Sequence, residues 1–125
     1  METQEIPHEQ WIVFLDSFSH QHNGWLATLE VLDTEFGAQS PAQDLPFEGI
    51  SLNSKEGRPE SILISVGRSV GDHLTHRIDH PTHIWLQRAP SGADSALEIE
   101  SDGDSKTLLR FRSAMSSEFV DDIVV

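Results

Sequence analysis

Four histidines stand close together in the sequence, and imidazoles at short spacing are common ligands of metal ions. Their pattern is His73-x2-His76-x3-His80-x2-His83. On a helix this spacing would gather imidazoles as zinc sites do. Pro81 argues against a helix here, and on a strand residues three apart point to opposite faces. We therefore expect histidines that face solvent or make single hydrogen bonds. A metal site is retained only as an alternative, with the candidate ligands Asp72, His73, His76 and His83.

No other group of residues predicts an active site. The chain has no cysteine, which excludes disulfides, thiolate metal sites and cysteine nucleophiles. Gly67-Arg68-Ser69-Val70-Gly71 has the spacing of a Gly-x-Ser-x-Gly elbow, but no helix is predicted to follow it, so it does not indicate a serine nucleophile beside Asp72-His73 or Asp79-His80. The turn Gly67-Arg68-x2-Gly71 lacks the lysine and the following helix of a phosphate-binding loop. We predict no catalytic residue and no cofactor, and we favour a role other than catalysis.

The histidines belong to two segments, about 72–78 and 82–88, that are predicted to form a hairpin around Asp79-His80-Pro81. In the expected register Arg77 pairs with His83, which turns His76 inward. The outward face then has a tryptophan beside arginine and histidine, a composition typical of interface hot spots. The predicted interaction surface consists of Arg68, His73, Arg77, His83, Trp85 and Arg88. The alternative for this region is that Trp85 lies beneath the N-terminal helix as part of the core.

The charge of the chain disfavours two classes of partner. The formal net charge is −13, which repels phosphate backbones and anionic lipid headgroups. Residues 61–90 differ from both flanks, because their two acids and three bases give +1. We expect no nucleic acid and no membrane as partner, and instead another protein or a second copy of the chain. The N-terminus has neither a basic nor an apolar region of a signal peptide, so a cytoplasmic location is expected.

The spacing of apolar residues predicts one amphipathic helix followed by strands. Trp11, Phe14, Leu15 and Phe18 lie at helical period, with Pro7 and Gly24 at positions that suit the two ends of a helix over about 7–22. From Trp25 the period changes to two, and short strands follow at about 25–32, 47–53 and 60–66, with a loop over 33–46. The sequence predicts one domain over 1–125, with a β-rich body over about 25–113. Its class is α+β but mainly β, a curled antiparallel sheet or small barrel of about 6–7 strands. Residues 114–125 form a short tail, a helix or an edge strand.

The last two strands, about 94–101 and 105–112, are predicted to form a hairpin. Its register is decided by which residues lie on the buried, apolar face. A two-residue turn would place Lys106 opposite Ile99, on the apolar face. A three-residue loop over Asp102-Gly103-Asp104 instead opposes Ile99 to Thr107 and Glu100 to Lys106. We therefore predict the second register.

Several of these segments resemble a bacterial family that is known only as a domain of unknown function. The segments are GWLATLEVL at 24–32, DLPFEGI at 44–50, GDHLTH at 71–76, ADSALEIES at 93–101 and TLLRFRS at 107–113. The resemblance covers most of the chain from the helix to Ser113. It implies a stand-alone small bacterial protein, and it brings no activity, cofactor or functional residue.

Three hypotheses for function follow from the sequence. The favoured one is a non-enzymatic module that binds another protein through the surface of residues 68–88. The first alternative is a small-molecule-binding or metal-binding protein, or an enzyme, that uses the histidines of 73–83. The second alternative is a self-associating structural protein, joined through an exposed edge strand of the last hairpin.

Overall fold

The computed structural model describes residues 2–35, 37–67, 73–88 and 94–112 of the chain. A 3-10 turn, η1 (His8–Gln10), leads into the single helix of these residues, α1 (Trp11–His22). Both lie within the range predicted for the helix, 7–22. The strands are β1 (Glu2–Glu5), β2 (Leu26–Asp33), β3 (Gly37–Lys55), β4 (Arg58–Val66), β5 (Leu74–Asp79), β6 (Pro81–Arg88), β7 (Asp94–Ser101) and β8 (Ser105–Arg112).

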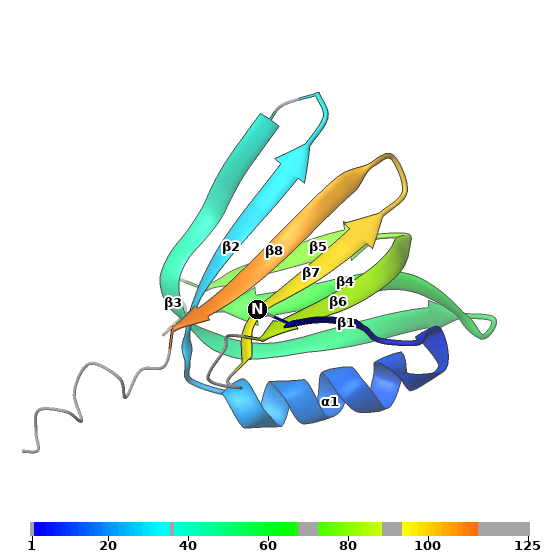
Figure 1. Cartoon of the computed structure of the whole chain (residues 1–125), viewed down its shortest axis with the longest axis horizontal. Helices are drawn as coiled ribbons and strands as arrows, with labels where there is room; N and C mark the ends of the chain where they lie inside the picture. Colours follow the sequence, from blue (N-terminus) through cyan, green and yellow to red (C-terminus); the bar gives the residue numbers. More distant parts are fainter. Residues whose placement is uncertain (1, 36, 68–72, 89–93, 113–125) are drawn as a thin grey trace, which may run out of the picture.

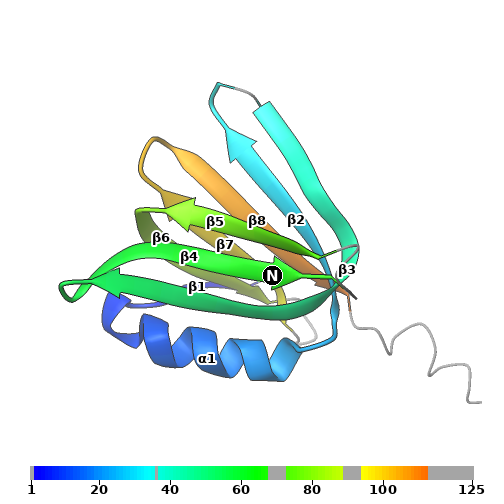
Figure 2. The same ribbon diagram turned by 180° about the vertical axis from the view of Figure 1, so that it is seen from behind.

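The eight strands form one antiparallel sheet in the order β1-β6-β7-β8-β2-β3-β4-β5. The sheet is curled but not closed, since β1 and β5 are its two edges. The mainly β class with one N-terminal helix is thus confirmed, as an open sheet and not as a closed barrel. Figures 1 and 2 show β3, β4 and β5 crossing over the other strands, so that the sheet encloses its own core.

Strand β3 causes this folding over, because its two halves pair with different neighbours. Residues 37–46 pair with β2, and residues 47–55 pair with β4. The change occurs at Pro46, after a residue of positive φ, Asp44 (φ 50°). The predicted loop over 33–46 is wrong for this reason. Pro41 is compatible with a strand here because this half of β3 has one free edge and a register shift beside the proline.

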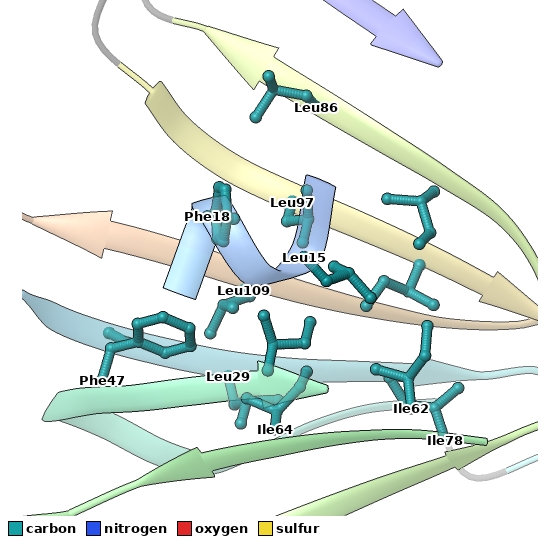
Figure 3. Packing of buried hydrophobic residues seen from close by; sticks show 14 of the residues in the cluster. Leu15, Phe18, Leu29, Phe47, Ile62, Ile64, Ile78, Leu86, Leu97 and Leu109 are labelled. Atoms are coloured by element: carbon teal, nitrogen blue, oxygen red, sulfur yellow. The ribbon is translucent and has the colours of Figure 1, made fainter. Parts of the chain in front are cut away.

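The core lies between the two layers of the curled sheet. Ile62, Ile64 and Val66 of β4 face Leu97 of β7 and Leu109 of β8, and all are fully buried. Figure 3 shows α1 adding Leu15 and Phe18 to this cluster. The apolar stripe predicted for the helix is confirmed, with Trp11, Leu15 and Phe18 buried and Phe14 half-buried.

Helix α1 also covers an edge of β3 that no strand pairs with. The Ser19 hydroxyl accepts a hydrogen bond from the Ile50 N–H at 2.9 Å and donates one to the Ile50 carbonyl at 3.0 Å. The Asn23 amide donates to the Glu48 carbonyl at 3.2 Å, and the Gly24 N–H donates to that of Phe47 at 2.8 Å. The helix therefore satisfies backbone groups that an adjacent strand would otherwise pair.

The predicted hairpin of residues 72–88 does not form. Strand β5 pairs with β4, whereas β6 pairs with β7 and β1. The two strands meet at a corner, His80 (φ 53°), whose N–H donates to Glu60 and whose carbonyl accepts from Asp102. The turn residues Asp79-His80-Pro81 are compatible with a corner as well as with a hairpin. Here each strand turns its apolar face to the core from a different layer of the sheet.

The register predicted for the last hairpin is confirmed. Ile99 opposes Thr107, Leu97 opposes Leu109, and Glu100 opposes Lys106 across a three-residue loop. Neither strand is an edge, because β7 also pairs with β6 and β8 also pairs with β2. An exposed edge in this hairpin, which was the basis of the self-association hypothesis, is therefore wrong. Within the ranges given above, no helix is long and apolar enough to cross a membrane. The tail 114–125 lies outside them.

The edge contact of α1 predicts a measurable effect of Ser19→Ala. The substitution removes two hydrogen bonds at a half-buried edge, and we expect a loss of about 1–2 kcal/mol in the free energy of unfolding. Ser17→Ala is the matched control, because Ser17 is exposed on the same helix and reports the gain in helix propensity alone. Chemical denaturation of the variants measures both. Equal stability of the two variants would contradict a role for Ser19 at the β3 edge.

Candidate functional site

Trp85 lies on the outward face of the sheet, half-buried. Its neighbours in β6, Ile84 and Leu86, are buried in the core, so the alternation of the strand turns Trp85 away from it. Helix α1 packs against β3, and the tryptophan that is buried at the helix is Trp11. The alternative placement of Trp85 beneath the helix is therefore wrong.

Carboxylates flank Trp85 on both sides across the strands. In register, Glu5 of β1 and Glu98 of β7 stand opposite Trp85. The neighbouring row places His83 opposite Glu100, and Glu100 opposite Lys106. We call these six residues the Trp85 face: Glu5, His83, Trp85, Glu98, Glu100 and Lys106.

The rings near Trp85 form a series that leads to the start of the helix. The His83 ring lies 6.1 Å from the Trp85 ring and 6.3 Å from that of His8, which stacks on Trp11 at 4.3 Å. Trp11 is fixed in turn, because its indole N–H donates to the Ile6 carbonyl at 2.9 Å. His83 is held by Glu5, with 2.7 Å between Nδ1 and Oε2. These contacts give the Trp85 face a defined shape.

The Trp85 face has more negative than positive charge. Lys106 is the cation for two glutamates, 3.9 Å from a Glu98 oxygen and 3.8 Å from a Glu100 oxygen. Both glutamates are largely buried for outward-facing residues, with side chains 19% and 27% exposed. A cleft of about 260 Å³ adjoins this row, lined by His83, Glu100, Lys106 and four other polar residues. Such a surface suits a cationic group better than an anionic one.

Other residues of the predicted interaction surface lie elsewhere. Arg77 and His73 belong to the layer of β5, where Arg77 pairs with Asp79 and His73 with Glu48, each at 2.7 Å. Arg88, opposite Glu2, ends β6. Arg68 lies outside the described residues, as does the metal candidate Asp72. His83 and Trp85 are therefore the two predicted surface residues that the structure brings together at one place.

The candidate metal ligands diverge. His73 binds a carboxylate on β3, His83 binds one on β1, and His76 faces the inside of the curled sheet. Among the residues with a described position, no group of three histidines and acidic residues could hold a metal ion. The divergence follows from the strand geometry, in which residues three apart leave opposite faces.

His76 instead lines a cleft on the open side of the sheet. We call it the β5 cleft: about 240 Å³ between β5, the start of β8 and Val31 of β2. Burial lowers the pKa of His76 from its ordinary value of 6.5, because the charged imidazolium is desolvated there. Thr107, a buried residue of β8, lines the same cleft.

Two residues of these sites, Glu5 and Thr107, were not among the candidates named from the sequence. Glu5 belongs to a four-residue strand that is exposed throughout, so no apolar alternation indicated it. Thr107 had a signal, since the hairpin register placed this hydroxyl on the inward, apolar face. A polar residue at a core position is the pattern that could have drawn attention to the cleft.

The lowered pKa of His76 predicts a pH-dependent contribution to stability. Below about pH 6.5 the unfolded chain takes up a proton that the folded His76 resists, so acidification destabilises the fold. Arg77, Asp79 and Asp102 are the charged groups that line the same cleft. We expect the melting temperature to fall less between about pH 7.5 and pH 5.5 in His76→Gln than in the wild type.

His20→Gln is the control for this measurement, since His20 is an exposed histidine on α1. Thermal denaturation at several pH values compares the three proteins. An identical pH dependence of His76→Gln and wild type would contradict the desolvation of His76.

Comparisons with known proteins give the family of the chain and no activity. A family model described as "Family of unknown function (DUF5335)" matches residues 2–120. An uncharacterized protein of Aquifex aeolicus (strain VF5) is 28% identical over 115 residues, which cover 92% of this chain and 96% of that protein. No solved structure matches the chain significantly. Since the family model spans nearly all of the sequence, the chain belongs to the family of unknown function DUF5335.

Proposed function

We propose that this protein is a non-enzymatic module that binds a basic segment of a partner protein on the Trp85 face. The observation that carries the proposal is the partly exposed Trp85, which stands in register between Glu5 and Glu98. An aromatic ring beside carboxylates provides both contacts that an arginine or lysine side chain needs, a π face and a counter-charge.

The tryptophan supports binding of a macromolecule through its size and position. Tryptophan is enriched among residues that dominate binding energy, particularly where neighbouring residues restrict access of water. On this face His83 and two glutamates, Glu5 and Glu98, surround the ring. The rigid series of rings behind His83 reduces the entropy that the face would lose on binding.

The charge of the protein supports a basic partner. A net charge of −13 attracts cationic surfaces over several ångströms and accelerates their association at low salt. The same charge opposes association of two copies, which makes self-assembly the weaker hypothesis. A cytoplasmic location is part of this proposal, and the absence of cysteine is compatible with a reducing compartment.

Lys106, although a cation itself, is compatible with the binding of a basic segment at the Trp85 face. Its distances of 3.8 and 3.9 Å from two carboxylates are those of a loose pair on a surface, which contributes little to stability. One lysine also neutralises only one of the two glutamates. A cation of the partner can therefore add to the row without first breaking a strong internal contact.

Trp85→Ala tests the proposal directly. The wild-type protein, Trp85→Ala and Leu108→Ala are used to capture proteins from the native host after cross-linking, with recovery measured by quantitative mass spectrometry. Leu108 is the matched control because it is a half-buried apolar residue on the same outward face. We expect at least one basic protein whose recovery falls about tenfold or more with Trp85→Ala and stays unchanged with Leu108→Ala.

The captured protein is then purified and titrated against the three forms by calorimetry at two salt concentrations. The expected result is weaker binding at high salt and a loss of about 1.4 kcal/mol or more in Trp85→Ala. Equal binding by Trp85→Ala and wild type would overturn the proposal. So would a partner whose binding is insensitive to salt, or the absence of any partner that depends on Trp85.

A further inference from the structure

The open side of the sheet contains a second candidate site, unrelated to the Trp85 face. We propose that the β5 cleft binds a small uncharged molecule that offers both a hydrogen-bond donor and an acceptor. The cleft lies on the inner side of the sheet, between edge strand β5 and the start of β8, and Trp85 lies on the outer side. Figure 2 shows β5 crossing in front of β8 there, with no strand beyond it.

Thr107 provides the first polar group. The residue is 3% exposed and lines the cleft, yet its hydroxyl makes no hydrogen bond with any residue in the described ranges. A buried hydroxyl normally has a partner, since leaving one without costs about 1–3 kcal/mol. Its neighbours across the strands, Ile99 and Val31, cannot provide one with their side chains. A molecule in the cleft would satisfy it.

His76 provides the second polar group. Its ring is half-buried and faces the same cleft, and neither nitrogen has a hydrogen-bond partner among the described residues. Burial keeps the ring in its neutral form, which has one donor nitrogen and one acceptor nitrogen. The cleft thus presents a hydroxyl and a neutral imidazole, both unpaired, at one place.

The remaining lining determines the size and charge of the ligand. Val31 and Ile78 provide apolar contact, and the volume of about 240 Å³ corresponds to roughly eight water molecules. At the rim, Arg77 and Asp79 already neutralise one another at 2.7 Å. Asp102, on the exposed turn, is the remaining charged residue of the lining. A charged ligand would have to lose its hydration beside the neutral His76 and the Thr107 hydroxyl, so an uncharged one fits best.

Three molecules of equal shape and different charge test this inference: acetamide, acetate and acetamidinium. Each is titrated into the full chain labelled with ¹⁵N, and the amide and imidazole resonances are followed by NMR. We expect saturable shifts with acetamide at millimolar concentration, centred on His76, Ile78 and Thr107. Acetate and acetamidinium should bind at least fivefold more weakly.

Thr107→Val separates a binding role of the hydroxyl from a structural one. The variant should lose acetamide affinity about tenfold while its melting temperature stays equal or rises, because an unpaired buried hydroxyl is removed. His76→Gln should also weaken binding. Thr75→Val, on the outward face of β5, is the control and should bind as the wild type does.

Three results would overturn the inference. The first is the absence of saturable shifts with acetamide, which means that the cleft holds only water. The second is preferential binding of acetate or acetamidinium. The third is a Thr107→Val variant that melts lower than the wild type and binds acetamide unchanged, which would assign the hydroxyl to the fold. None of these results depends on the binding of a protein at Trp85.

Discussion

The structure depends on one long strand that belongs to both layers of the sheet. Beyond Pro46, strand β3 leaves β2 and continues with β4 alone, so one row of its backbone groups loses its strand partner. Helix α1 replaces that partner, most directly where the Ser19 hydroxyl bonds both backbone groups of Ile50. The same helix inserts Leu15 and Phe18 between the layers. Strand β3 and helix α1 together therefore account for the curling of the sheet, the coverage of its exposed edge and the formation of the core.

Two different surfaces result from this arrangement. In the part of the chain that the structure describes, no helix or strand covers the outward face of β6 and β7, and a tryptophan there stays partly exposed among carboxylates. The inward face near β5 is covered incompletely because β5 is an edge of the open sheet, and His76 and Thr107 line the cleft there. Exposed aromatic area suits a macromolecule, whereas a cleft with polar groups on its walls suits a small molecule. The fold thus separates the two kinds of recognition onto opposite sides of one sheet.

The sequence could predict elements whose signal is local and could not predict how the layers meet. The helix from its apolar stripe and the last hairpin from the burial of Ile99 and Thr107 were both correct, because each rests on residues that are near in sequence. The corner at His80 has the turn residues of a hairpin, and only the distant strands β4 and β7 decide between them. The first half of β3 contains two prolines, and its free edge, which tolerates them, is invisible in sequence. Of the residues of the Trp85 face, His83 and Trp85 could be singled out from the sequence, whereas Glu5 could not, because it belongs to a polar strand without periodicity.

The position of β8 has a consequence for how the chain reaches this fold. Although β8 is the last strand of the sheet along the chain, it stands between β7 and β2, and its register joins Leu26 to Arg112. During synthesis, β2 and the first half of β3 are made before β8. Until β8 has been made, the edge of β2 that pairs with it stays unpaired. Contacts between residues so distant in sequence slow folding, and unpaired strands formed early are prone to aggregate. The large negative charge of the nascent chain, eleven acids and two bases in residues 1–60, opposes that aggregation while the central strand is still being made.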